Sequence, residues 1–407
     1  MAIQKKKVAL NLDVLLTLDE ERRALVTKVD TARARQNTVS DLISQTTGPE
    51  RDRMIIEMKA LKDEMQGSEE KLKQVIEQWR GLMLQVPNIP DMSVPEGASD
   101  ADNQEIKVWG EKPVFNFTPK SHIDVMLNLN MVDFERGTKV HGFRGYFLKN
   151  DGARLSFAIW NYAIDFFLQK GFELMLAPGI VKKPHFYGTG HLPNDAEDLY
   201  ETQDGDYLSG TAEVPIMGYH SDEILKKEEL PKKYLAFSPC YRREAGSYGK
   251  DTKGLIRVHE FYKLEQVVLC EANHEESVKW HEWLNRNTEE FIESLKIPYH
   301  TVINCAGDLG LGQVKKYDVE LWVPLENKYR EISSASYFHD FQTRRFNTKY
   351  SDSDNKKYFA HSLNCTAIPT PRILVSLVEN YQQADGSVMI PEALRPYMGG
   401  KDRIARK

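Results

Sequence analysis

Two runs of apolar residues near the start of the chain repeat with alternating spacings of three and four. They occupy residues 15–43 and 58–86, and the first is interrupted by polar side chains at Arg22 and Gln36. This spacing predicts a heptad seam along each of two long helices. Residues 45–50, Gln-Thr-Thr-Gly-Pro-Glu, end one helix and start the next. We therefore predict an antiparallel helical hairpin about 50 Å long.

A hairpin this long and thin is not a core, and its pattern alone also fits an oligomerisation or spacer element. Residues 1–86 carry 15 Lys and Arg against 14 Asp and Glu, whereas the whole chain has a formal net charge of −6. The hairpin is thus less acidic than the remainder, which permits contact with RNA without requiring it. The candidate contacts are the basic residues Arg22, Arg23, Lys28, Arg33, Arg35 and Arg53.

A proline-punctuated segment follows the hairpin, and residues 86–97 read Val-Pro-Asn-Ile-Pro-Asp-Met-Ser-Val-Pro-Glu-Gly. The helix must stop there, because proline interrupts helical hydrogen bonding. At 407 residues and 41% hydrophobic side chains, the chain is long enough for two or more domains. We expect a helical domain over residues 1–89 and a larger domain over residues 90–407. The net charge argues against a generally basic nucleic-acid-binding protein.

The cysteine pattern indicates which cellular compartment and which metal sites to expect. Cys240, Cys270, Cys305 and Cys365 form no Cys-x-x-Cys pair and have no histidine pair at ligand spacing. We expect neither a disulfide framework nor a zinc site, and a reducing compartment. No apolar run approaches the length of a membrane span, and the N-terminus lacks the apolar stretch of a signal peptide. The expected location is cytoplasmic, without membrane association.

The stretch 238–265 reads as two antiparallel strands joined by a long loop rich in Gly, Ser and Lys. Side chains alternate faces along a strand, so Arg242 and Glu244 share one face of the first run. Arg257, His259, Phe261, Lys263 and Glu265 share one face of the second run.

ATP would supply binding partners for the charged and aromatic side chains on these faces. Arginine forks suit phosphate oxygens, a phenylalanine ring can stack on a purine, and a carboxylate can accept a hydrogen bond from the exocyclic amine. Glu265 would remain for a substrate ammonium or hydroxyl. The alternative is an exposed hairpin with a cross-strand ladder of ion pairs, which stabilises little.

The residues Tyr241-Arg-Arg-Glu244, followed by the Phe-x-x-x-Glu of Phe261 and Glu265, resemble motif 2 of class II aminoacyl-tRNA synthetases. The run from Glu244 to His259 is similar to the seryl-tRNA synthetase family in particular. The resemblance implies an α+β fold in which a mainly antiparallel sheet flanked by helices follows an N-terminal helical hairpin. It also implies activation of L-serine by ATP and transfer of the seryl group to tRNA(Ser), and to tRNA(Sec) as well.

Two more segments resemble class II motifs. A helix over residues 153–171 and a strand ending at Pro178 look like motif 1, which implies a homodimer; an ordinary core helix with an edge strand is the alternative. Pro371-Arg372, at the start of a predicted helix, looks like motif 3.

Residues 318–324 and 329–334 read as two further strands of the sheet. The Gly-rich segments 188–193 and 307–312 lack the pattern of phosphate loops and read as turns.

The resemblance implies roles for particular residues. Arg242 and Arg372 would be catalytic, and Glu331 and Ser334 would hold Mg²⁺, which takes such oxygen ligands together with substrate phosphate. The implied ATP-binding residues are Arg242, Glu244, Arg257, Phe261, Glu331, Ser334 and Arg372. The implied serine-binding residues are Thr211, Glu213, Arg242, Glu265, Asn364 and Thr366. The hairpin would reach the long variable arm of the tRNA.

The chain departs from the family pattern in two places. Ser336-Tyr337 stands where the family has Ser-Asn, so we expect local repacking there. The chain begins close to its first long helix, where the family usually has further residues, so either the chain is shortened or the base of the hairpin is braced differently. Two other functions remain open at this stage. An amino acid:carrier-protein ligase would lack the long hairpin, and a non-catalytic tRNA-binding paralogue would lack several of the residues named above.

Overall fold

The computed structural model describes residues 2–247, 249 and 251–406, so Tyr248 and Lys250 of the predicted loop lie outside the described residues. Two compact units are present: residues 7–87 form the hairpin unit, and the chain from residue 88 onward forms the body. The helices are α1 Ala2–Lys5, α2 Leu12–Gln45, α3 Pro49–Met83, α4 His122–Asn128, α5 Phe134–His141, α6 Asn150–Leu168, α7 Lys183–Thr189, α8 Glu213–Tyr219, α9 His274–Ser294, α10 Phe341–Phe346 and α11 Arg372–Tyr381.

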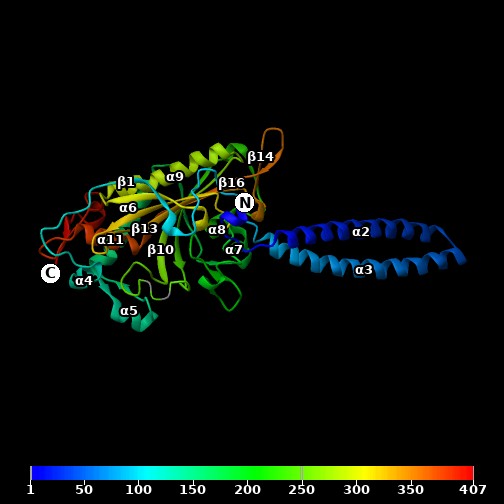
Figure 1. Ribbon diagram of the computed structural model, residues 1–407, viewed down its shortest axis with the longest axis horizontal. Coiled ribbons are helices and arrows are strands. Elements are labelled where there is room, and N and C mark those ends of the chain that lie inside the picture. The colour runs from blue at the N-terminus through cyan, green and yellow to red at the C-terminus, as the bar shows by residue number, and fades with distance from the viewer. Residues whose placement is uncertain (1, 248, 250, 407) are drawn as a thin grey trace. The chain divides into compact units, whose positions relative to one another are not determined.

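The hairpin unit consists of α2 and α3, which lie side by side (Figure 1). The Asn11 side chain caps α2 by accepting the backbone N–H groups of residues 13 and 14, at 3.0 and 3.2 Å. Gly48, at φ +75°, reverses the chain before Pro49 starts α3. Seam residues such as Val29 and Val75 are buried. The predicted hairpin is confirmed, although α3 ends at Met83 instead of continuing to residue 86.

Ion pairs between the two helices use several of the basic residues that the sequence offered for RNA. Arg22 and Arg23 both pair with Asp19, and the Arg22 guanidinium lies 4.6 Å from the centre of the Trp79 ring. Those two pairs lie within α2, whereas the pairs between the helices are largely exposed, so each of the latter stabilises the hairpin by at most about 1 kcal/mol. The pairs between helices are Lys28–Glu64 (2.9 Å), Arg33–Glu69 (2.7 Å), Lys71–Glu21 (2.6 Å) and Arg35–Glu57.

The body is built on one eight-stranded sheet. Its edge pair β9 and β4 is parallel, and the other neighbouring strands are antiparallel. This confirms the predicted mainly antiparallel sheet, including the two strands expected within residues 318–334. In spatial order the strands are β1 Gln104–Trp109, β11 Tyr299–Ile303, β12 Lys315–Val323, β13 Lys328–His339, β16 His361–Thr370, β10 Glu260–Cys270, β9 Lys232–Tyr241 and β4 Glu173–Leu176.

Helices α6 and α9 pack against this sheet and close the main core. Helix α9 contacts β10, β12, β13 and β16, while α6 contacts β4, β9 and β16. Where the two helices meet, Phe167 of α6 and Phe291 of α9 are fully buried, with ring centroids 5.7 Å apart. Burying side chains of this size stabilises the fold by roughly 1.5–3 kcal/mol each. The sheet is thereby a rigid platform for groups on its strands.

Short strands complete the body. Three of them, β5, β6 and β7, form a small sheet just before the segment that carries Thr211, and β14 pairs with both β15 and β8. These strands are β2 Val132–Asp133, β3 Phe147–Leu148, β5 Ile180–Val181, β6 Tyr200–Glu201, β7 Tyr207–Leu208, β8 Ile224–Lys226, β14 Lys349–Ser351, β15 Lys357–Phe359, β17 Val388–Met389 and β18 Arg403–Ile404.

The motif 1 elements differ from the prediction in their bounds. The helix begins at Asn150 and ends at Leu168, three residues before Gly171, whose φ of +80° is left-handed and incompatible with continuing the helix. The following strand, β4, ends at Leu176 and not at Pro178. Tyr337 is fully buried on β13, and its hydroxyl donates to Asp91 Oδ2 at 2.7 Å. A larger side chain is thus accommodated inside the core with a polar partner.

The N-terminal segment contains a short helix, α1, which the sequence did not predict. Just after it, Lys6 is buried, and its ammonium donates to the backbone carbonyls of Gly310, Leu311 and Gln313 at 3.0, 3.0 and 2.5 Å. Burial lowers the pKa of Lys6 to about 7. The predicted Gly-rich turn of residues 307–312 therefore serves as an acceptor for this lysine.

The four cysteines are all buried and free. Within the described residues, no helix has the length and apolarity needed to cross a membrane.

Candidate functional site

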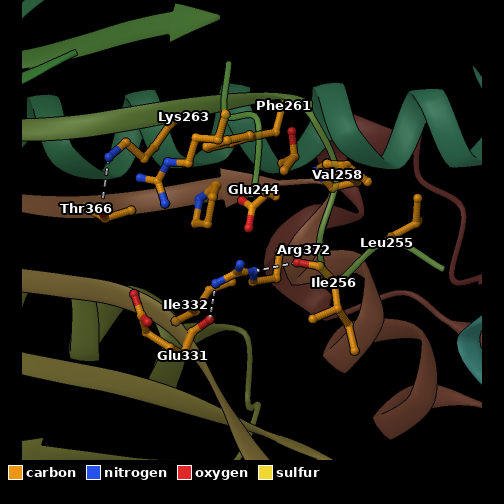
Figure 2. A pocket seen from close by; sticks show the side chains of 14 residues that line it. Glu244, Leu255, Ile256, Val258, Phe261, Lys263, Glu331, Ile332, Thr366 and Arg372 are labelled. Atoms are coloured by element: carbon orange, nitrogen blue, oxygen red, sulfur yellow. Dashed lines mark hydrogen bonds between the residues drawn. The ribbon is translucent and has the colours of Figure 1, made fainter. Parts of the chain in front are cut away.

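A cleft of about 510 Å³ opens on the body where β10, β13 and β16 meet the start of α11. Six of the predicted site residues line it together: Arg242, Glu244, Phe261, Glu331, Thr366 and Arg372. Figure 2 shows Glu244, Phe261, Glu331 and Arg372 around this cleft, with Lys263 and Thr366 at one end.

Two arginines from different elements face the cleft. The Arg242 guanidinium lies 5.4 Å from the centre of the Phe261 ring, and Phe261 is the second residue of β10. Arg372, the first residue of α11, donates through Nε to Ile256 O at 2.9 Å and through Nη1 to Glu331 O at 3.0 Å (Figure 2). Burial lowers the pKa of Arg372, but a guanidinium stays charged. Two fixed cations in one cleft favour an anionic ligand.

The predicted strand pairing was wrong at its loop end. β9 ends at Tyr241 and β10 begins at Glu260, so Arg242, Glu244 and Arg257 lie in the connecting loop. Glu244 has a left-handed φ of +56° and accepts a hydrogen bond from Arg257 Nη1 at 2.6 Å. The side chains of this loop are therefore oriented by the ion pair between Glu244 and Arg257, and not by the alternation of a strand.

Farther along the loop, Asp251 pairs with Arg330 of β13 at 2.7 Å and lies 3.6 Å from Arg257. The loop is therefore tied to the neighbouring strand beside the cleft, through charges whose partners lie far apart in the sequence.

The inner end of the cleft holds a buried polar cluster around Lys263. The Lys263 ammonium lies 2.5 Å from Glu265 Oε2 and donates to Thr211 Oγ1 at 2.8 Å and to Thr366 Oγ1 at 3.5 Å. The Thr366 hydroxyl donates to Glu265 Oε2 at 3.3 Å. Burial raises the pKa of Glu265, and the Lys263 charge opposes that rise. Phe261, Lys263 and Glu265 do alternate along β10 as predicted.

A second buried carboxylate stands beside this cluster. Glu213, the first residue of α8, accepts a hydrogen bond from Gln342 Nε2 at 2.6 Å, and Ser362 donates to Gln342 Oε1 at 2.8 Å. Burial raises the pKa of Glu213, and hydrogen bonds from Gln342 and Asn364 oppose the rise. The predicted residues Thr211, Glu213, Glu265, Asn364 and Thr366 thus gather at one end of the cleft.

Two β-bulges aim the side chains that the sequence pattern could not orient. On β13 the register with β12 passes from Glu331 to Ser333 and omits Ile332. Glu331 and Ser334 are three residues apart and would face opposite sides of a regular strand. The extra residue of the bulge brings both side chains to the same side of the sheet. On β16 the register with β10 omits Ala367, so that Thr366 lies opposite Glu265.

Glu331 and Ser334 supply the hard oxygen donors that Mg²⁺ takes. Glu331 is exposed at the cleft, whereas Asp318, which lies opposite Ser334, is buried, and burial raises its pKa to about 7. Among the described residues, no three or more His, Cys, Asp or Glu side chains are grouped so that they could hold a metal ion by themselves. The donor set fits an ion that takes its remaining ligands from phosphate oxygens.

Sequence reasoning missed Lys263 and Gln342 as members of the site. Lys263 was recognised on the correct face of its strand, but only the structure shows its ammonium bound to both Thr211 and Glu265. Gln342 lies on α10, distant in sequence from Glu213, and its contact depends on tertiary packing.

The predicted RNA contacts lie in the hairpin unit. Five of these six basic residues pair with acidic residues of the hairpin, and among the described residues no acidic partner is found for the sixth, Arg53.

The cleft and its sheet are those of a class II aminoacyl-tRNA synthetase. Residues 198–381 match the family model described as the tRNA synthetase class II core domain (G, H, P, S and T). Residues 1–90 match the model of the seryl-tRNA synthetase N-terminal domain. The chain belongs to the seryl-tRNA synthetase family.

Individual relatives agree over the full length. The serine–tRNA ligase of Deinococcus radiodurans is 43% identical over 406 residues, covering 100% of this chain and 96% of that protein. The structure of seryl-tRNA synthetase from Pyrococcus horikoshii complexed with ATP superposes with a TM-score of 0.89 at 36% identity, covering 97% of this chain and 93% of that one. The cytoplasmic serine–tRNA ligase from Naegleria fowleri in complex with AMP gives a TM-score of 0.86 at 34% identity, covering 100% and 94%. Neither alternative function receives comparable support.

Proposed function

We propose that this ATP-dependent serine–tRNA ligase activates serine at the junction of the arginine-lined cleft and the Lys263 cluster. The observation that carries this proposal is the shared location of two cations, Arg242 and Arg372, and a buried cluster of serine-sized polar groups. The first step needs two anions held against each other with their charges neutralised.

For ATP, Phe261 stacks on the adenine and Glu244 accepts a hydrogen bond from its amine. Arg242 binds the α-phosphate, while Arg257 and Arg372 bind the remaining phosphates. The Arg242 guanidinium over the Phe261 ring supports this assignment, because it puts the α-phosphate close to the base-stacking face. Arg257 is paired with Glu244 in the free protein and would exchange that partner for phosphate.

Mg²⁺ would be held by Glu331 and Ser334 together with phosphate oxygens. When bound, the ion neutralises phosphate charge and supports departure of pyrophosphate. Glu331 contributes its carboxylate from the exposed side, and its backbone carbonyl already accepts from Arg372. The metal ligand and the second arginine are therefore coupled through one residue.

For serine, Thr211 and Glu265 bind the ammonium, and Thr366 together with Glu265 reads the hydroxyl. Lys263 now makes the contacts that the substrate ammonium would make, so its side chain must shift towards the serine carboxylate when serine binds. Glu213 and Asn364 support this pocket from beside Thr211. A site built to bond a hydroxyl rejects alanine strongly, because its buried polar groups would be left unpaired.

The reaction follows from this placement. A serine carboxylate oxygen attacks the α-phosphorus, the bond to the β-phosphate oxygen breaks, and pyrophosphate leaves. Arg242 and Arg372 stabilise the charge that develops on the phosphate oxygens. The seryl-adenylate then reacts with the 3′ end of tRNA(Ser), and also with tRNA(Sec), and AMP is released.

Pyrophosphate exchange across a panel of amino acids, followed by charging of tRNA(Ser) and tRNA(Sec), tests the proposal. We expect exchange with serine, and seryl transfer to both tRNAs. Exchange with glycine or alanine but not with serine, or activation without any tRNA charging, would contradict it and favour an amino acid:carrier-protein ligase.

We propose further that the hairpin binds the tRNA through its exposed basic residues. Arg23, Lys28, Arg33 and Arg35 are each more than half exposed, in ion pairs that a phosphate can displace at little cost. Arg22 is only 26% exposed and packs on Trp79, so it would exchange its partner less readily. Arg53 requires no such exchange and is the strongest candidate.

A homodimer formed through motif 1 is also proposed. β4 is an edge strand of the main sheet, and Leu176 at its end is 82% exposed. Phe157 on α6 and Ile180 on β5 are each 60% exposed. Exposed apolar side chains beside a free sheet edge are typical of a contact surface. Replacing Leu176 with arginine should produce monomers in sedimentation analysis; a persistent dimer would refute this surface.

The free cysteines favour the cytoplasm as the location of the protein.

A further inference from the structure

A second cavity, of about 830 Å³, adjoins the cleft on the far side of Arg242. Thr211 and Arg242 belong to its wall, and its other lining residues include Phe186, His191, Asp195 and Gly210. In the proposed function Arg242 holds the α-phosphate and Thr211 the serine ammonium. The carbonyl carbon of seryl-adenylate would then lie between these two residues. The cavity is thus the open space from which a second substrate can reach that carbon.

His191 has one ring nitrogen committed and the other available. Its Nδ1 lies 2.8 Å from Thr189 Oγ1. The Thr189 hydroxyl has a single proton, which it shares with the carbonyl oxygens of His185 and Phe186 at 3.2 and 3.3 Å. When the ring proton is on Nδ1, it donates to Thr189, and Nε2 keeps its lone pair. Within the described part of the chain, the contact with Thr189 is the only hydrogen bond of the His191 ring.

Burial and nearby cations keep the His191 ring neutral, and the cavity around it carries groups that can bind hydroxyls. Burial lowers the pKa of His191, Asp195 opposes this, and the cations Arg242 and Lys263 reinforce it. Asp195 and Asp198 line the same cavity, together with the apolar side chains of Phe186, Leu199 and Val214. Carboxyl groups form hydrogen bonds with hydroxyl groups, and the apolar side chains can pack against a ring. The cavity therefore suits a hydroxylated group attached to an apolar ring, such as a nucleoside.

We propose that this cavity binds the 3′-terminal nucleoside of tRNA and that His191 Nε2 is the general base of seryl transfer. The ribose hydroxyl oxygen forms a bond to the serine carbonyl carbon, and its proton moves to Nε2. The bond between that carbon and the phosphate oxygen breaks, and AMP leaves with the electron pair. His191 then returns the proton to solvent. Thr189 is a positioning residue, because it fixes the ring so that Nε2 is the unprotonated nitrogen.

The inference rests on the proposed placement of serine, so its test separates activation from transfer. Enzyme-bound radiolabelled seryl-adenylate is mixed with tRNA(Ser) in a quench-flow instrument, and pyrophosphate exchange is measured on the same preparations. His191→Gln keeps a polar side chain but cannot accept a proton. We expect its transfer rate to fall by roughly 10²–10⁴-fold, the usual contribution of a general base, while exchange stays within about twofold of wild type.

Two further comparisons distinguish catalysis from structure. Thr189→Val should slow transfer without changing exchange, and Thr189→Ser, which restores the hydroxyl, should recover it. His185→Gln is the matched histidine control, on the helix α7 that precedes His191, since His185 stacks on Phe346 and lines neither cavity. Unchanged transfer in His191→Gln, or transfer and exchange that fall together, would overturn the assignment. Loss of serine-dependent exchange in wild type would instead refute the proposed function.

Discussion

Replacing Glu265 with glutamine should damage serine activation and stability while sparing ATP binding. The Glu265 and Lys263 side chains are only 3% and 7% exposed, and their charged atoms lie 2.5 Å apart. Removing the carboxylate charge leaves a buried ammonium without its partner, which costs about 3–5 kcal/mol of folding free energy. Loss of one charge-assisted hydrogen bond to serine costs a further ~1.5–3 kcal/mol of binding, equivalent to roughly 10- to 150-fold weaker serine binding.

The double substitution Lys263→Met and Glu265→Leu separates these two effects. It replaces the buried pair with apolar side chains of similar size, so unfolding free energy should return to within about 1 kcal/mol of wild type or exceed it. Serine activation should remain lost. Glu265 does not line the nucleotide cleft, so ATP affinity should change little in Glu265→Gln. Lys263 does line the cleft, so the double variant is compared for stability and serine activation only.

Urea unfolding followed by tryptophan fluorescence gives the stability, and calorimetric titration with ATP and with serine gives the affinities. Equal losses of ATP and serine affinity in Glu265→Gln would refute the reasoning. So would a double variant as unstable as the single one, since the cost would then not arise from an unpaired buried charge.

Three other perturbations have definite expected outcomes. His281 is fully buried, with its pKa lowered to about 4, so its contribution to stability is present above pH ~6.5 and is lost as pH falls towards 4. His281→Gln, which can still donate to Ala335 O, should flatten the pH dependence of urea unfolding between pH 7 and 4.5; an unchanged slope would contradict this. Glu331→Gln should raise the Mg²⁺ concentration needed for half-maximal pyrophosphate exchange, whereas the control Glu320→Gln, on the opposing strand, should not. The same Mg²⁺ concentration for both variants would contradict the assignment of Glu331 as a ligand. Arg53→Glu should raise the KM for tRNA(Ser) in charging assays several-fold, and an unchanged KM would exclude it as a contact.

The sequence predicted the elements whose signals are local. The heptad seams specified α2 and α3, because a helix repeats its buried face at these spacings. Alternation along β10 correctly placed Phe261, Lys263 and Glu265 on one face. The family resemblance supplied residues such as Thr211 and Arg372, which no local pattern distinguishes from a cap or a helix start.

The sequence did not predict features that depend on long-range pairing. The bulge at Ile332, which lets Glu331 and Ser334 serve one side of the sheet, is visible only in the register of β12 with β13. Strand alternation was extended too far at Arg242 and Arg257, where an ion pair with Glu244 and not a strand fixes the loop. His191 lay in a segment that read as a turn, because its significance comes from the cavity that it lines.

The most direct measurement is the structure of the enzyme with a non-hydrolysable analogue of seryl-adenylate. The account predicts adenine on the Phe261 ring and the α-phosphate replacement beside Arg242. It also predicts the serine ammonium between Thr211 and Glu265, with Lys263 moved from its present position. An analogue bound outside this cleft, or one whose serine end leaves the Lys263–Glu265 contact intact, would contradict it.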